Sequence, residues 1–214
     1  MSQRQEVKAQ IQHRALVAVV RSTAEQVEPL VNALLEGGVS AIEITFSVPN
    51  APEVIATVKR RFGDRVLLGA GTVLDARKAA DAIAAGARYI VAPNTNLDVI
   101  RLCNERDVAV APGAFTPTEV AAAWAAGADI VKLFPAESLG IPYLKALRAP
   151  MPDIPIMPTG GVDVANAADW LRAGAFALGV GSSLVRKDAL ASGNYALITE
   201  TARKFMAAIA SARA

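Results

Sequence analysis

The sequence predicts an α/β fold of the (β/α)8 TIM-barrel class, with residues 1–214 forming one domain. Short runs rich in β-branched residues recur about every 20 to 25 residues, and each is followed by a segment with helical periodicity. Three of these segments, 79–87, 120–128 and 167–175, end in Ala-Gly-Ala directly before the next run, as repeated βα units do. A doubly wound open sheet is the alternative, but eight such units favour the barrel.

Eight stretches are expected to form the strands. They are short, apolar and bounded by small or polar residues, and they cover residues 15–20, 41–46, 66–70, 89–92, 108–111, 130–134, 154–158 and 176–180. The segment 22–38 illustrates the intervening helices, because its apolar residues recur at helical spacing and Gly37 supplies a stop. The segments 139–148 and 185–205 fit the helical pattern less neatly.

Composition and charge restrict the class of function. Hydrophobic residues make up 53% of the chain, which suits one large core, and the net charge is only +2. No block of Lys and Arg is long enough to predict binding to nucleic acid or to a membrane surface, although small phosphorylated molecules remain compatible. The single cysteine, Cys103, predicts an inert thiol and a cytoplasmic setting. The polar N-terminal stretch and the lack of an apolar run of about 20 residues predict a soluble protein.

The most informative residue is Lys132, which interrupts the apolar run of residues 130–134. Because side chains alternate along a strand, Val131 and Leu133 are expected to face the helices, and Lys132 the barrel interior. Barrel enzymes hold their chemistry at the carboxyl ends of the strands, where this lysine lies. Burial lowers the pKa of an amine, and a neutral amine attacks carbonyl carbon to form a Schiff base. The alternative is a structural lysine that extends to the rim or pairs with an acid.

A second ionisable group, Glu43, is expected inside the barrel. In the stretch 41–46, Ile42 and Ile44 face the helices, so Glu43 shares the inner face with Thr45. A carboxyl group near an imine-forming lysine can relay protons during carbon–carbon bond chemistry. The alternative is a structural ion pair with the lysine.

Small residues follow several strands. The stretch "GAGTVLD" (69–75) offers Thr72, and "VAPN" (91–94) ends the fourth strand. After the fifth strand, Thr116 or Thr118 is expected to serve as a helix N-cap rather than to contact substrate.

Two glycine pairs predict a phosphate site. They lie in "MPTGGV" (157–162) and "GVGSSL" (179–184), after the seventh and eighth strands, where barrels often bind phosphate. Glycine lets backbone amides converge on an anion, Ser182 adds a hydroxyl group, and a following helix N-terminus adds its dipole. Each pair is also compatible with an ordinary tight turn.

Other chemistries find little support. His13 is the only histidine and precedes the first strand, so a Ser-His-Asp triad is implausible. No His, Cys or carboxylate cluster has metal-ligand spacing, and no GxGxxG follows a strand. Lysine is therefore the best candidate for the reactive group, and no metal or cofactor is expected.

Together, "EITF", "GAGTV", "VAPN", "PGAFTPTE", "VKLFPA", "PTGGV" and "GSSLV" resemble the 2-keto-3-deoxy-6-phosphogluconate (KDPG) aldolases, also known as 4-hydroxy-2-oxoglutarate aldolases. The likeness covers about residues 15–205. It implies a class I aldolase, a homotrimer without metal, whose small-molecule substrate is a phosphorylated keto acid split into pyruvate and glyceraldehyde 3-phosphate. It also implies roles for particular residues. Lys132 would form the Schiff base, and Glu43 would be the general acid/base. Thr72 would bind the keto-acid carboxylate, Pro93 would line the pyruvate pocket, and the phosphate would be bound by Gly160, Gly161, Gly181 and Ser182.

One departure from the family pattern concerns the carboxylate. The best-known members have an arginine four residues after the glutamate, whereas this chain has Ser47. Arg21 at the end of the first strand is a candidate replacement and resembles the 2-keto-3-deoxy-6-phosphogalactonate aldolases. The preferred C4 epimer therefore stays open. Two alternatives belong to a different class of function. One is a non-catalytic phosphosugar-binding barrel, and the other is an isomerase in which Glu43 abstracts a proton and Lys132 acts only electrostatically.

Overall fold

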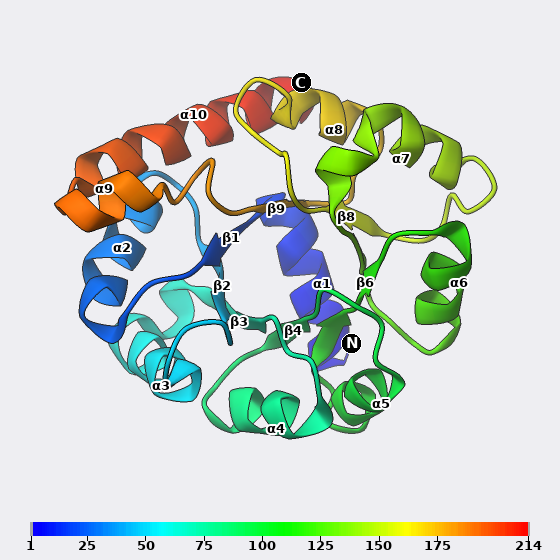
Figure 1. The fold of residues 1–214 in the computed structure, drawn as a ribbon, viewed down its shortest axis with the longest axis horizontal. Coiled ribbons are helices and arrows are strands. Elements are labelled where there is room, and N and C mark those ends of the chain that lie inside the picture. Colours follow the sequence, from blue (N-terminus) through cyan, green and yellow to red (C-terminus); the bar gives the residue numbers. More distant parts are fainter. Residues whose placement is uncertain (1, 214) are drawn as a thin grey trace.

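The computed structural model describes residues 2–213 and shows an α/β fold in which helices surround a curled parallel sheet (Figure 1). The strands in chain order are β1 Leu16–Val20, β2 Ala41–Thr45, β3 Leu67–Gly71, β4 Tyr89–Val91, β5 Ala109–Ala111, β6 Gly113–Ala114, β7 Val131–Leu133, β8 Ile156–Pro158 and β9 Leu178–Val180. Each of the eight predicted stretches contains or overlaps an observed strand. The ninth arises because the fifth stretch resumes as β6 beyond Pro112, a residue with no N–H to continue a ladder.

The strands form two parallel sheets that meet at both edges. One has the order β5-β4-β3-β2-β1-β9 and the other β6-β7-β8. A bridge between Thr159 and Gly179 joins the end of β8 to β9. At the other edge, Asp129 N and Ile130 N, which directly precede β7, donate to Val110 O of β5 at 3.0 and 3.3 Å. The sheet therefore curls around an interior that receives one face of every strand.

Helices cover the outside of the sheet and its amino-terminal end. They are α1 Gln3–Arg14, α2 Ala24–Glu36, α3 Ala51–Phe62, α4 Ala76–Ala84, α5 Leu97–Glu105, α6 Pro117–Ala125, α7 Gly140–Arg148, α8 Ala167–Arg172, α9 Lys187–Ser192 and α10 Tyr195–Arg213, with short 3-10 turns η1 Gly63–Arg65 and η2 Ala136–Ser138. Gly37 is the C-cap of α2, as predicted. Thr116 is the N-cap of α6 and forms a capping box with Glu119, which confirms the expected capping threonine. None of the helices in the described part is both long and apolar enough to cross a membrane.

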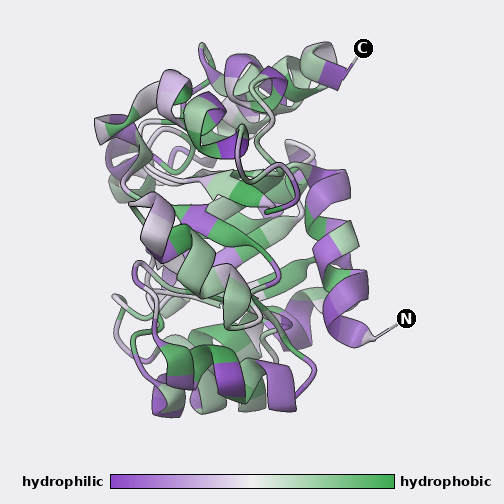
Figure 2. Cartoon of the chain, turned by 90° about the vertical axis from the view of Figure 1, so that its right-hand side faces the viewer, coloured by the Kyte–Doolittle hydropathy of each residue, from purple (hydrophilic) through white to green (hydrophobic). Residues whose placement is uncertain are grey.

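The buried residues fall into an outer and an inner cluster. Ile42, Ile44, Val131 and Leu133 belong to the outer cluster, which packs between strands and helices. Ile130, on the same face as Lys132, belongs to the smaller inner cluster. The alternation predicted for β2 and β7 is therefore confirmed. Hydrophobic colouring covers much of the strands in Figure 2, whereas the helices alternate between hydrophobic and hydrophilic.

Helix α1 closes the amino-terminal end of the curled sheet. Its Val7 and Ile11 complete the inner cluster, together with residues from the first positions of several strands. Arg4 of α1 forms an ion pair with the buried Asp129 at 2.9 Å and also donates to Gly127 O. The polar N-terminal stretch thus packs as a plug, which leaves the carboxyl ends of the strands as the accessible mouth.

Candidate active site

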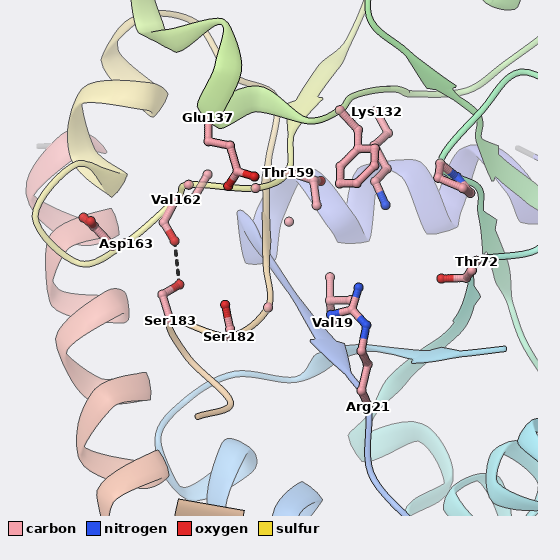
Figure 3. A pocket seen from close by; sticks show the side chains of 16 residues that line it. Val19, Arg21, Thr72, Lys132, Glu137, Thr159, Val162, Asp163, Ser182 and Ser183 are labelled. Carbon is pink, nitrogen blue, oxygen red and sulfur yellow. Dashed lines mark hydrogen bonds between the residues drawn. The ribbon is translucent and has the colours of Figure 1, made fainter. Parts of the chain in front are cut away.

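A cavity of about 310 Å³ opens at the carboxyl ends of the strands (Figure 3). It is lined by eight of the nine residues predicted for the site: Arg21, Thr72, Pro93, Lys132, Gly160, Gly161, Gly181 and Ser182. The ninth, Glu43, does not line the cavity but lies buried in the interior beside it. The fold therefore places eight of the residues predicted at the strand ends around one cavity, as expected.

Lys132 is a buried amine that forms no salt bridge within the described chain. It occupies the centre of β7, where its register partners are Gly113 and Met157, and only 5% of it is exposed. Its Nζ lies 5.0 Å from the centre of the Phe134 ring. Within residues 2–213, no carboxylate oxygen lies within 4.0 Å of this Nζ, so the alternative of a structural ion pair is not formed. Burial lowers the pKa of Lys132 and the Arg21 charge lowers it further, against an opposing effect of Glu43.

Glu43 is a buried carboxyl group held against a glycine. It is 1% exposed, and its Oε1 has no hydrogen-bond partner among the described residues. Burial raises the pKa of Glu43, whereas the charges of Lys132 and Arg21 oppose this rise. A Cβ on Gly71 would lie on top of the Glu43 carboxyl group, so the glycine gives the side chain its space.

Arg21 and Thr72 bring polar groups to the same side of the cavity as Lys132 (Figure 3). In the described chain, Arg21 has no ion-pair partner, which leaves its guanidinium group available to an anion. Thr72 has a φ of 57°, a conformation that non-glycine residues rarely adopt. Ser47, at the position of the family arginine, is hydrogen-bonded through Oγ to Thr45 Oγ1 at 2.6 Å and does not line the cavity.

Two loops form the opposite side of the cavity. Gly160 and Gly161 have φ values of 94° and 68°, a backbone that requires glycine. Ser183 Oγ donates to Val162 O at 2.6 Å and thereby ties the loop after β9 to the loop after β8. The helix N-termini expected directly behind the glycine pairs are absent there, because α8 and α9 begin only at Ala167 and Lys187. Any anion at these loops is bound by turn amides and hydroxyl groups.

Several cavity residues were missed by the sequence analysis: Val19, Phe134, Glu137, Thr159, Val162, Asp163, Gly179 and Ser183. The sequence could have identified Thr159, because it lies two residues after the inward Met157 and strand alternation places both on the same face. Its Oγ1 is buried and, across the described residues, has no hydrogen-bond partner. Glu137 has no such signal, since it comes from the turn η2 and meets Gly160 and Gly161 only through the tertiary fold.

A curled parallel sheet that holds a buried lysine at its mouth and a buried carboxyl group in the interior beside it favours an aldolase of the lysine-dependent class. The family model for KDPG and KHG aldolase, where KHG is 4-hydroxy-2-oxoglutarate, matches residues 7–201. The chain belongs to this family.

Similar proteins include both epimer classes. The chain is 38% identical to the 2-dehydro-3-deoxy-6-phosphogalactonate aldolase of Escherichia coli K12, over 80% of this chain and 84% of the relative. It is 36% identical to the 2-dehydro-3-deoxy-phosphogluconate aldolase of Treponema pallidum, over 87% and 89% respectively. A solved structure of KDPG aldolase from Legionella pneumophila, with pyruvate captured as a covalent carbinolamine, superposes with a TM-score of 0.86 at 30% identity and covers 92% of this chain and 96% of that one.

Proposed function

We propose that this chain is a class I aldolase that cleaves KDPG into pyruvate and glyceraldehyde 3-phosphate. The observation that carries the proposal is the Lys132 amine, buried and without a counterion in the described chain, on a cavity that also presents an arginine and two anion-compatible glycine loops. A lysine kept only for structure needs a partner, because an unpaired buried charge is costly. A lysine with a lowered pKa is instead ready to attack a ketone.

In the proposed mechanism, neutral Lys132 adds to the C2 carbonyl carbon of the substrate, and loss of water from the carbinolamine gives a Schiff base. The Glu43 carboxylate then removes the proton from the C4 hydroxyl group, the C3–C4 bond breaks and its electron pair moves into the iminium group. Glyceraldehyde 3-phosphate leaves. Protonated Glu43 returns a proton to C3 of the enamine, and water hydrolyses the imine to release pyruvate and the free lysine.

The substrate is proposed to lie across the cavity, with its keto acid beside Lys132 and its phosphate on the two loops. Arg21 and the backbone at Thr72 hold the carboxylate, and Pro93 lines the pyruvate end. The phosphate contacts the backbone amides of Gly160, Gly161 and Gly181 and the hydroxyl group of Ser182. The position of Lys132 in Figure 3, apart from Ser182 and Glu137, supports this orientation, and Arg21 reaches between the two ends, since a Cβ on Gly181 would lie 3.5 Å from its Nη1.

The galactonate epimer is a second candidate substrate. Arg21 lines the cavity and Ser47 does not, an arrangement that resembles the phosphogalactonate enzymes. The ratio of kcat/KM for the two purified C4 epimers, measured side by side through pyruvate release, decides between them. A ratio in favour of the galactonate epimer contradicts the gluconate assignment and leaves the reaction type unchanged.

Borohydride reduction in the presence of pyruvate tests the covalent step. We expect peptide mass spectrometry to find the reduced adduct on Lys132, with none in Lys132→Ala and a normal yield in Lys204→Ala, whose ammonium group is exposed and paired with Glu200. An active enzyme with unmodified Lys132 contradicts the proposal. Substantial activity in Lys132→Ala indicates the isomerase instead, and ligand binding without turnover indicates a phosphosugar-binding protein.

The proposal includes a complete (β/α)8 barrel in a homotrimer. Hydrogen bonds at both sheet edges support closure of the barrel. Three large apolar residues are exposed and support a subunit contact at this rim: Leu74 and Phe115 on the loops after β3 and β6, and Leu97 at the start of α5. Light scattering tests it: we expect a mass three times that of the chain, and a lower mass for Leu97→Glu.

A cytoplasmic setting also belongs to the proposal. The only cysteine, Cys103, is buried, and burial raises the pKa of its thiol to about 12. Such a thiol is inert, and a single cysteine forms no internal disulfide, which is typical of proteins from a reducing compartment. Fractionation of the native host, with activity expected in the soluble cell extract, tests this setting.

A further inference from the structure

Two buried polar atoms beneath the cavity have no partner, although the sheet places their residues side by side. Glu43 Oε1 and the Tyr89 hydroxyl group each lack a hydrogen bond to any of residues 2–213. Tyr89 is 2% exposed and lies in the inner cluster, among apolar side chains that offer its hydroxyl group nothing. Buried polar groups in proteins are nearly always paired, so each of these needs an explanation.

The strand register joins the two residues through a glycine. Glu43 on β2 pairs with Gly69 on β3, and Gly69 pairs with Tyr89 on β4, so the three lie at one level of the sheet. A Cβ on Gly69 would lie 2.3 Å from ring atoms Cε2 and Cζ of Tyr89. The phenol ring therefore lies across β3, and its Cζ, which carries the hydroxyl group, has crossed from β4 towards β2. Neighbouring strands are only about 4.8 Å apart, so this crossing brings the hydroxyl group towards Glu43.

The two orphan atoms are also chemically complementary. A phenol donates one hydrogen bond, and a carboxylate oxygen only accepts. Hydrogen bonds at catalytic groups are often long in the free enzyme and shorten once the substrate is bound.

We propose that Tyr89 is a positioning residue that donates a hydrogen bond to the Glu43 carboxylate when the keto acid is bound, and so holds that carboxylate for proton transfer at the Schiff base. This inference rests on the proposed aldolase function and adds a residue to it. The sequence offered no sign of it, because a tyrosine at the start of an apolar strand looks like an ordinary core residue.

The charges around the pair allow this role. The positive charges of Lys132 and Arg21 lower the pKa of Glu43 against the effect of burial. The charge of Arg14, at the other end of the interior, likewise opposes the rise in the pKa of Tyr89. Burial, reinforced by the charge of Glu43, raises the pKa of Tyr89 well above its usual value, so the phenol keeps its proton and remains a donor throughout an assay. A donor on the carboxylate favours its charged form, and this opposes the effect of burial on the pKa of Glu43.

Tyr89→Phe tests the inference, because it removes the hydroxyl group and keeps the ring over Gly69. The readout is the pH dependence of hydrogen–deuterium exchange at the methyl group of pyruvate, which reports proton transfer at the enamine without cleavage. A hydrogen bond to a carboxylate lost in Tyr89→Phe raises the pKa of Glu43, so we expect the acidic limb to move up by about one to two pH units. The KM for pyruvate stays unchanged, and the rate recovers at higher pH.

A matched control is Tyr195→Phe, which loses the same atom from α10 on the outside of the fold. Its pH profile should equal that of the wild type. An equal profile for Tyr89→Phe overturns the inference, and so does a rate lowered equally at every pH, which a purely structural role predicts. Thermal unfolding of Tyr89→Phe checks that it folds, since it loses only an unpaired hydroxyl group. Borohydride trapping on the wild type separates the two claims: without an adduct at Lys132 the aldolase proposal fails, whereas with an adduct and an unshifted profile only the role of Tyr89 fails.

Discussion

The substitution Gly71→Ala tests whether the exact place of the Glu43 carboxyl group controls turnover. Gly71 is the last residue of β3 and carries no substrate-binding group of its own. A Cβ there would lie 1.6 Å from Oε1, 2.4 Å from Cδ and 2.6 Å from Cγ of Glu43. All three of the nearest atoms thus belong to the one side chain that is proposed to move protons.

The structure sets the size of the effect. Side-chain contacts to a Cβ essentially never fall below 3.0 Å, so Oε1 must retreat by about 1.4 Å from its present 1.6 Å. A displacement of about 1 Å at a catalytic group costs about 100-fold in rate. We therefore expect kcat for cleavage to fall at least about 100-fold, which equals about 2.7 kcal/mol of lost transition-state stabilisation. Crowding should also lower stability by about 1 to 3 kcal/mol.

The assay is cleavage of the phosphorylated keto acid with coupled detection of pyruvate, together with urea unfolding. The matched control places Gly71→Ala in a Glu43→Ala background, where no side chain remains for the new methyl group to displace. There the substitution should cost neither further activity nor stability. Wild-type kcat in the single variant, or the same loss in both backgrounds, would refute the claim that Gly71 acts through Glu43.

Four further expectations follow from the site and its surroundings. Lys132→Ala should lower kcat by about 10⁴-fold, measured by pyruvate release at saturating substrate, because it removes the group that forms the covalent intermediate. Thr159→Val should lower kcat/KM about tenfold without loss of stability, because the orphan hydroxyl group is available only to substrate; an unchanged kcat/KM contradicts this. Burial raises the pKa of Glu43, so the stability linked to its neutral form is full below pH 4.5 and is lost as the pH rises through the raised value; Glu43→Gln should therefore melt above the wild type near pH 8, with a gap that closes towards pH 4. Arg4→Ala should cost about 3 kcal/mol in urea unfolding with KM unchanged, because it leaves Asp129 buried without its cation; a change in KM would show that α1 reaches the site.

The predictions from sequence succeeded where one local rule determines the outcome. Alternation along a strand placed Lys132 and Glu43 on the inner face, and the outer cluster contains their neighbours Val131 and Ile42 as that rule requires. Helix capping chemistry identified Thr116. In each case the information lies within a few residues, so tertiary context had little to add.

The predictions were incomplete where distant segments meet. The N-terminal stretch has few apolar residues, and its role as a plug depends on Val7 and Ile11 meeting the interior. Glu137 enters the cavity from a short turn without periodicity. Tyr89 matters through Gly69 on the next strand, and register between strands cannot be worked out from either strand alone.

The distribution of unpaired polar atoms supports a site shaped for a ligand more strongly than any single residue does. Four buried side-chain atoms have no partner in the described chain: Glu43 Oε1, the Tyr89 hydroxyl group and Thr159 Oγ1 lie in the interior or at its mouth, and Asn104 Oδ1 lies on α5. Each unsatisfied group costs about 1 to 3 kcal/mol, and apolar residues of similar shape would remove that cost. A core selected only for stability has no reason to keep the first three together beside an unpaired lysine. In the proposed reaction, the substrate gives Thr159 Oγ1 a partner and exchanges protons with Glu43, which in turn accepts from Tyr89, so the unpaired atoms support the same site.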